Sequence, residues 1–109
     1  MRNTAKQAII VLTNAASETA AETIALELLE QRLAACVNIL PAVKSFFRWE
    51  GSIQQENEVV LLIKTTAERQ EHVFARIRQL HAYAVPEIIA VKIDSINQQY
   101  REWLENVVQ

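Results

Sequence analysis

The residues best suited to chemistry in this sequence lie around a short turn near position 84. His81 and Glu87 stand on either side of a Tyr-Ala-Val-Pro segment that follows a predicted helix. An imidazole and a carboxylate are both ligands for borderline divalent metals, so the pair predicts a metal site. The alternative is that His81 only bonds to a terminal carbonyl of the preceding helix, where the helix dipole favours it.

Cys36 is the only cysteine and is a third candidate metal ligand, because a thiolate suits copper(I). It lies in an apolar run directly after a predicted helix, where burial and the negative helix end both disfavour the thiolate. We therefore favour a buried structural thiol, with copper binding by converging copies as the alternative. One cysteine excludes an internal disulfide framework and favours a reducing compartment, so we expect a cytoplasmic location.

Charged and aromatic residues also predict a pocket for a small anion or metabolite at a subunit boundary. The alternatives are interface packing for the tryptophan and a solvated strand end for the lysine. Glycine-rich phosphate loops and the common hydrolase signatures are missing, so we expect no enzymatic activity. The expected lining residues are Lys64, Tyr83, Pro86, Glu87 and Trp49.

Composition limits the other function classes. The chain has 109 residues, which fits one domain over 1–109, and its formal net charge is -2. This charge excludes a dedicated nucleic-acid binder. The first apolar run, residues 8–12, is too short for a membrane span or a signal-peptide core, so we expect no membrane partner.

Hydrophobic periodicity predicts the element order β-α-β-β-α-β followed by a C-terminal helix, which is an α+β, ferredoxin-like arrangement. Thr65 and Glu68 have the spacing of a capping box that opens the second helix. The expected strands are 8–12, 34–49 with a bend at Pro41, 53–64 and 88–93, and the expected helices are 17–33, 65–80 and 95–107.

The predicted hairpin around Gly51, the only glycine, is longer than the helix that should cover it. An extended segment 35–49 spans roughly 50 Å, whereas a helix of about 16 residues spans about 24 Å. Its far end carries Phe46, Phe47 and Trp49, an apolar patch that soluble monomers seldom expose. The hairpin either folds back at Pro41 or packs against further copies, and we favour a symmetric assembly.

Five segments of the sequence resemble the CutA family of divalent-cation tolerance proteins, in the order and spacing of that family. The resemblance implies a ferredoxin-like subunit in a PII-like homotrimer with a protruding hairpin, linked to tolerance of copper and other divalent metals. It implies no required cofactor, although copper or another divalent cation is an expected ligand. The segments are RLAACVN at 32–38, FRWEG at 47–51, LLIKTT at 61–66, LHAYAVPEI at 80–88 and YREWL at 100–104.

The chain departs from the family at four positions. Ala82 and Ala84 stand where the family usually has proline and a polar or acidic residue, and Thr13 and Leu80 stand where some members have cysteine and histidine. High-affinity copper binding is therefore not expected. The hypotheses are a weak divalent-metal protein, a PII-like trimer that binds a small ligand between subunits, and a scaffold in which the named residues only pack.

Overall fold

The computed structural model describes residues 6–108 and has an α+β architecture. No helix within this range is both long and apolar enough to cross a membrane. The elements in chain order are β1 (Ala8–Ala15), α1 (Glu18–Glu30), β2 (Cys36–Trp49), β3 (Ser52–Thr66), a 3₁₀ turn (Ala67–Arg69), α2 (Gln70–Leu80), β4 (Ile88–Lys92) and α3 (Gln98–Val107).

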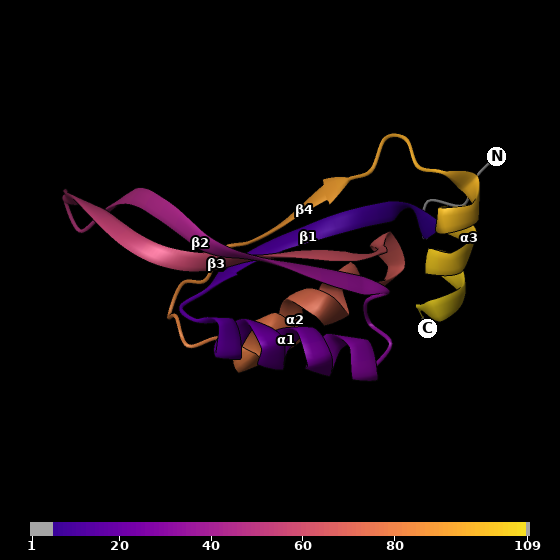
Figure 1. Cartoon of the computed structure of the whole chain (residues 1–109), viewed down its shortest axis with the longest axis horizontal. Helices are drawn as coiled ribbons and strands as arrows, with labels where there is room; N and C mark the ends of the chain where they lie inside the picture. Colours follow the sequence, from indigo (N-terminus) through magenta and orange to yellow (C-terminus); the bar gives the residue numbers. More distant parts are fainter. Residues whose placement is uncertain (1–5, 109) are drawn as a thin grey trace.

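The four strands form one sheet in the order β2-β3-β1-β4, and every neighbouring pair is antiparallel. Helices α1 and α2 lie side by side on one face of this sheet, and α3 lies at one end of it (Figure 1). The predicted α+β, ferredoxin-like element order is confirmed.

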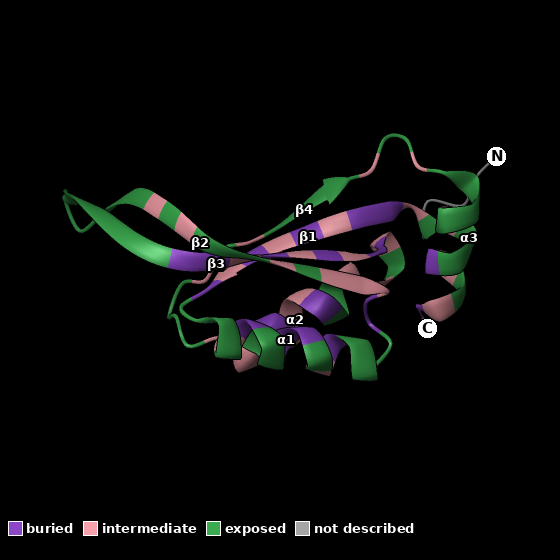
Figure 2. Ribbon diagram, in the orientation of Figure 1, coloured by how far each residue is buried: buried purple, intermediate pink, exposed green. Residues whose placement is uncertain are grey.

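The two faces of the sheet differ in burial because successive strand residues point to opposite sides. Val11, Leu61 and Ile63 face α1 and α2 and have no exposed surface. Their neighbours on the opposite face, such as Leu12 and Leu62, are only half-buried (Figure 2). We call these the covered face and the open face. The covered face carries the hydrophobic core.

Strands β2 and β3 continue beyond the end of β1 as a two-stranded arm, residues 43–58, which makes the molecule 48 Å long (Figure 1). The turn at its tip consists of Glu50 and Gly51, both with positive φ, as a type I′ hairpin turn requires. The predicted long hairpin and its glycine turn are therefore present.

A β-bulge interrupts β2 at the base of the arm, where a bend at Pro41 is predicted. Leu40 pairs with Val60, but the next pair is Val43 with Glu58, so β2 contains one extra residue. Ala42 has a φ of 60°, in the left-handed region. Proline lacks the N–H that a ladder needs, which explains why pairing stops here.

Two predicted helix starts are wrong. Thr65 does not cap a helix, because it lies in β3 and its hydroxyl donates to the Leu33 carbonyl oxygen at 2.6 Å. The last helix is capped by Asn97, whose side chain accepts from the backbone N–H groups of Gln99 and Tyr100, and not by Ser95. The predicted start of the first helix at residue 17 agrees with the structure, where Ser17 is the N-cap of α1 and its side chain accepts from the Ala20 N–H.

Candidate functional site

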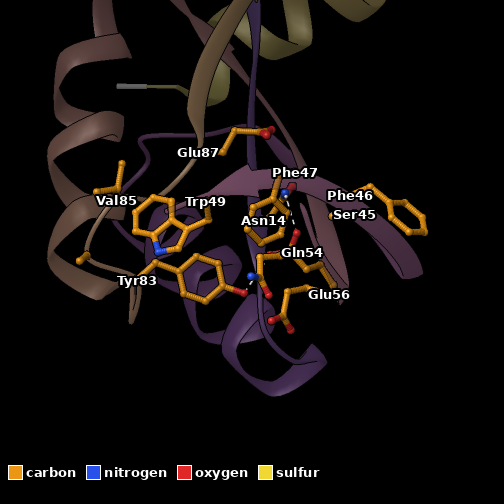
Figure 3. A pocket seen from close by; sticks show the side chains of 12 residues that line it. Asn14, Ser45, Phe46, Phe47, Trp49, Gln54, Glu56, Tyr83, Val85 and Glu87 are labelled. Atoms are coloured by element: carbon orange, nitrogen blue, oxygen red, sulfur yellow. Dashed lines mark hydrogen bonds between the residues drawn. The ribbon is translucent and has the colours of Figure 1, made fainter. Parts of the chain in front are cut away.

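An open hollow of about 720 Å³ lies between the arm and the segment that joins α2 to β4 (Figure 3). Strand β3 contributes two carboxylates to it and β2 contributes aromatic rings. Among the residues described, no lysine, arginine or histidine lines the hollow. The lining residues are Asn14, Ser45, Phe46, Phe47, Trp49, Gln54, Glu56, Glu58, Tyr83, Ala84, Val85 and Glu87.

Glu58 is a buried carboxylate at the inner end of this hollow, with only 6% of its surface exposed. Its Oε2 atom accepts from the Tyr83 hydroxyl at 2.8 Å, and its Oε1 atom accepts from Asn14 Nδ2 at 3.3 Å. Both donors are neutral, and the ion pairs found within residues 6–108 do not include Glu58. Hydrogen bonds, and not one of these ion pairs, therefore fix the position of the Glu58 carboxylate.

The carboxylate of Glu58 affects the pKa of the Tyr83 phenol. Burial, the hydrogen bond to Glu58, and the negative charges of Glu58 and Glu56 together raise the pKa of Tyr83 to about 12, with burial as the largest cause. The phenol consequently stays protonated and remains a donor to Glu58 at physiological pH.

The aromatic side of the hollow comes from one side of the arm. Directly opposed residues of an antiparallel pair share a face, and the pairs Phe47 with Gln54 and Ser45 with Glu56 lie on the hollow side. Figure 3 shows the rings of Trp49, Tyr83 and Phe47 among the lining side chains, whereas Phe46 points away from them. Trp49 keeps 49% of its surface exposed in the single chain.

The predicted metal ligand His81 uses both ring nitrogens within the chain. Its Nε2 atom lies 2.5 Å from the carbonyl oxygen of Asn14, and its Nδ1 atom accepts from the Tyr83 N–H at 3.1 Å. A carbonyl oxygen can only accept, so Nε2 carries the proton and the Nδ1 lone pair is occupied. The ring thus fastens the α2–β4 segment to β1, and it does not bond to a carbonyl of its own helix.

The other predicted ligands lie apart. Cys36 pairs with Lys64, four positions along the sheet from the strand pair at Asn14, and is half-buried on the open face. Within residues 6–108, no group of three or more His, Cys, Asp or Glu side chains is arranged to hold a metal ion. The structure therefore leaves Cys36 away from His81 and Glu87 in a single chain.

Of the five predicted pocket residues, the structure brings together Trp49, Tyr83 and Glu87. Pro86 does not line the hollow, and the ammonium group of Lys64 lies 5.9 Å from the ring centroid of Tyr100 on α3.

Sequence reasoning missed Glu58, Glu56 and Asn14. The available signal was Glu58 itself, a charged residue immediately before the apolar run 59–63. Charged side chains are seldom fully buried without a partner, so a carboxylate at the edge of a core strand marks a place where another element must approach.

Comparison with known proteins gives consistent matches along the chain. A family model described as CutA1 divalent ion tolerance protein matches residues 9–107. The divalent-cation tolerance protein CutA of Thermus thermophilus is 45% identical over 95 residues, which cover 87% of this chain and 92% of that protein.

Solved structures match equally well. The structure of CutA1 from Oryza sativa superposes with a TM-score of 0.93 at 34% identity and covers 98% of each chain. A structure from Archaeoglobus fulgidus, described as a periplasmic divalent cation tolerance protein CutA, has a TM-score of 0.91 at 37% identity and covers 94% of this chain and 99% of that chain.

The expected cytoplasmic location is wrong by this comparison, because the Archaeoglobus fulgidus protein is described as periplasmic. The expectation rested on a single cysteine. One thiol excludes an internal disulfide in any compartment, so it carries little information about location.

Proposed function

Because the chain belongs to the CutA1 divalent ion tolerance family, we propose that it acts in divalent-cation tolerance as a non-enzymatic protein that binds divalent metal ions weakly. The observation that supports weak binding is the set of carboxylates along the hollow, Glu56, Glu58 and Glu87, without a cationic side chain among the lining residues described. Oxygen ligands of this kind suit hydrated divalent cations.

Glu87 is the residue we expect to matter most, because its carboxylate is exposed and lies in the hollow. His81 can assist only by giving up its hydrogen bond with Asn14 or with Tyr83. Cys36 can assist only across copies of the chain. These costs and the lack of a three-ligand group in the described chain are the reasons why we propose weak binding.

Calorimetric titration with copper(II) and zinc(II) tests the metal proposal. We expect Glu87→Gln to weaken binding several-fold, while Glu22→Gln, the same change of charge on the exposed side of α1, leaves it unchanged. His81→Ala and Cys36→Ser report the two other candidate ligands. Identical isotherms for the wild type and Glu87→Gln would contradict the role of Glu87.

We also propose that the chain forms a homotrimer through the open face of its sheet. Leu40, Ile89 and Val91 on this face are 41%, 50% and 50% exposed, which is unusual for large aliphatic side chains clustered on one surface. Burying such a face against further copies of the same chain is the common solution in symmetric assemblies.

Light scattering coupled to size-exclusion chromatography tests the assembly. We expect a mass of about three times the 12.4 kDa of the chain. Val91→Glu should reduce the mass because it places a charge on the open face, whereas Leu26→Glu, on the exposed side of α1, should not. A wild-type mass near 12.4 kDa at micromolar concentration would contradict the proposal.

A further inference from the structure

The hollow beside the arm combines a carboxylate with aromatic rings in a way that a hydrated metal ion does not require. Only 6% of the surface of Glu58 is exposed, and the hydrogen bonds described for its carboxylate come from two neutral groups. An ionised carboxylate offers about four acceptor positions. The hydrogen bonds described for its side chain fill two of them, and Glu58 is one of the residues that line the hollow.

A buried charge is costly unless an opposite charge or strong hydrogen bonds compensate it. Tyr83 and Asn14 hold the Glu58 carboxylate in position but bring no positive charge. Glu56 and Glu87 add two more carboxylates to the lining, so the hollow attracts cations. The charge alone does not distinguish a metal ion from an organic cation.

The aromatic rings of the hollow favour an organic cation over a metal ion. Trp49, Phe47 and Tyr83 line the same hollow as the carboxylates. A guanidinium or alkylammonium group gains from an aromatic face through cation–π attraction, and a guanidinium also stacks on it. A strongly hydrated divalent ion gains little from such a wall. At about 720 Å³ the hollow is within the range of small-molecule sites.

We propose that this hollow binds a small organic cation that carries a guanidinium or ammonium head, with Glu58 accepting hydrogen bonds from the head and Trp49 covering its apolar side. Tyr83 acts as a positioning residue, because its hydroxyl orients the Glu58 carboxylate. Metal binding is proposed at the same hollow but depends mainly on Glu87, whereas the organic cation depends on Glu58 and Trp49.

The experiment uses the full-length protein in its native assembly, in buffer with EDTA, and n-butylguanidinium as the probe. Its neutral isostere n-butylurea is the matched control ligand. Binding is followed by the fluorescence of Trp49 in a Trp103→Phe background, since these are the two tryptophans of the chain. We expect saturable binding of the guanidinium and at least about tenfold weaker binding of the urea, as loss of a charge-assisted hydrogen bond predicts.

Variants then test the two residues. Glu58→Gln should weaken guanidinium binding about tenfold or more, Trp49→Leu should weaken it several-fold by calorimetry, and Glu22→Gln should leave it unchanged. Equal affinity for the charged and neutral probes, or unchanged affinity in both hollow variants, would overturn the proposal. If Glu58→Gln fails to fold, Trp49→Leu and the pair of probes decide the question, because Trp49 is half exposed and outside the core.

One further experiment distinguishes a free ligand from a side chain of another copy in the hollow. Arg48 lies on the opposite side of the arm from Trp49 and Phe47, so a second copy could bring it to the hollow. If Arg48→Gln binds the probe and the wild type does not, the site is filled by the protein itself and the proposal fails. EDTA keeps this result independent of the metal titrations, so each proposal can fail alone.

Discussion

The covered and open faces of the sheet use similar residues but meet different surroundings. Leu61 and Leu62 are neighbours in β3, yet Leu61 is fully buried under the helices and Leu62 is only half-buried on the other side. The strand run 59–63 has no alternation of apolar and polar residues. Such a run is typical of a strand covered on both faces, and the chain itself covers only one of them. The difference supports the proposed assembly, in which other copies of the chain would cover the open face.

The largest effect on stability is expected from truncating a side chain on the covered face, with the matching change on the open face as its comparison. Leu61→Ala should lower the free energy of unfolding by about 3 kcal/mol, because it leaves a cavity in a closed core, and the variant should keep the wild-type mass. Leu62→Ala should cost about 1 kcal/mol in folding and should instead weaken association. Urea unfolding and sedimentation of both variants check this, and equal losses by both measures would remove the distinction between the faces.

A second test compares two buried threonines on the covered face. Thr65 donates to the Leu33 carbonyl, whereas the Thr13 hydroxyl has no hydrogen-bond partner within residues 6–108. Thr65→Val should therefore destabilise the fold by about 1 to 2 kcal/mol, because the carbonyl loses its donor. Thr13→Val should be neutral or stabilising by up to about 1 kcal/mol. Thermal denaturation of the two variants measures the contrast, and a loss of stability in Thr13→Val would contradict it.

The arm offers a test that does not touch either face of the sheet. Gly51 has a φ of 81°, and an added Cβ would meet no atom within 4 Å. Gly51→Ala should cost about 1 kcal/mol through backbone strain alone. Gly51→Asn should cost less, since asparagine adopts positive φ more readily. Equal stability of the three proteins in urea would show that the tip is frayed in solution.

The smallest effect concerns the charge of Tyr83 and appears only at high pH. Its pKa is raised from 10.0 to about 12, so its contribution to stability is fully present below pH 10 and is lost as the pH rises through about 12. Absorbance titration in a Tyr100→Phe background should show one phenol ionising near pH 12. Glu58→Gln should lower that pKa only part of the way, since it removes the charge of Glu58 while the burial of the phenol, the largest cause, remains. An unchanged curve would mean that Glu58 does not act on the phenol.

The element order, the bend near Pro41 and the turn at Gly51 were predictable because each depends on local sequence. Thr65 misled the prediction for the same reason. Its spacing to Glu68 fits a cap, but a carbonyl at Leu33, 32 positions away in the chain, engages its hydroxyl and keeps it in the strand.

The site was less predictable than the fold. Trp49, Tyr83 and Glu87 were named from residue type and line the hollow, whereas Lys64 lies six positions along β3 from Glu58, beside Tyr100 of α3. Glu58 was missed because its role depends on Tyr83, 25 positions later. Local periodicity in the sequence does not reveal a contact between residues that are 25 positions apart.

The single extra residue in β2 keeps both halves of this strand in step with β3. Leu40 and Val43 are three positions apart, yet they pair with Val60 and Glu58, which are two positions apart and lie on the same side of β3. Deleting Ala42 would therefore restore an unbroken ladder in which Val43 still pairs with Glu58, and Phe47 and Trp49 would stay on the side of the carboxylates. A one-codon deletion at this bulge would thus straighten the base of the arm while leaving the same side chains beside the hollow.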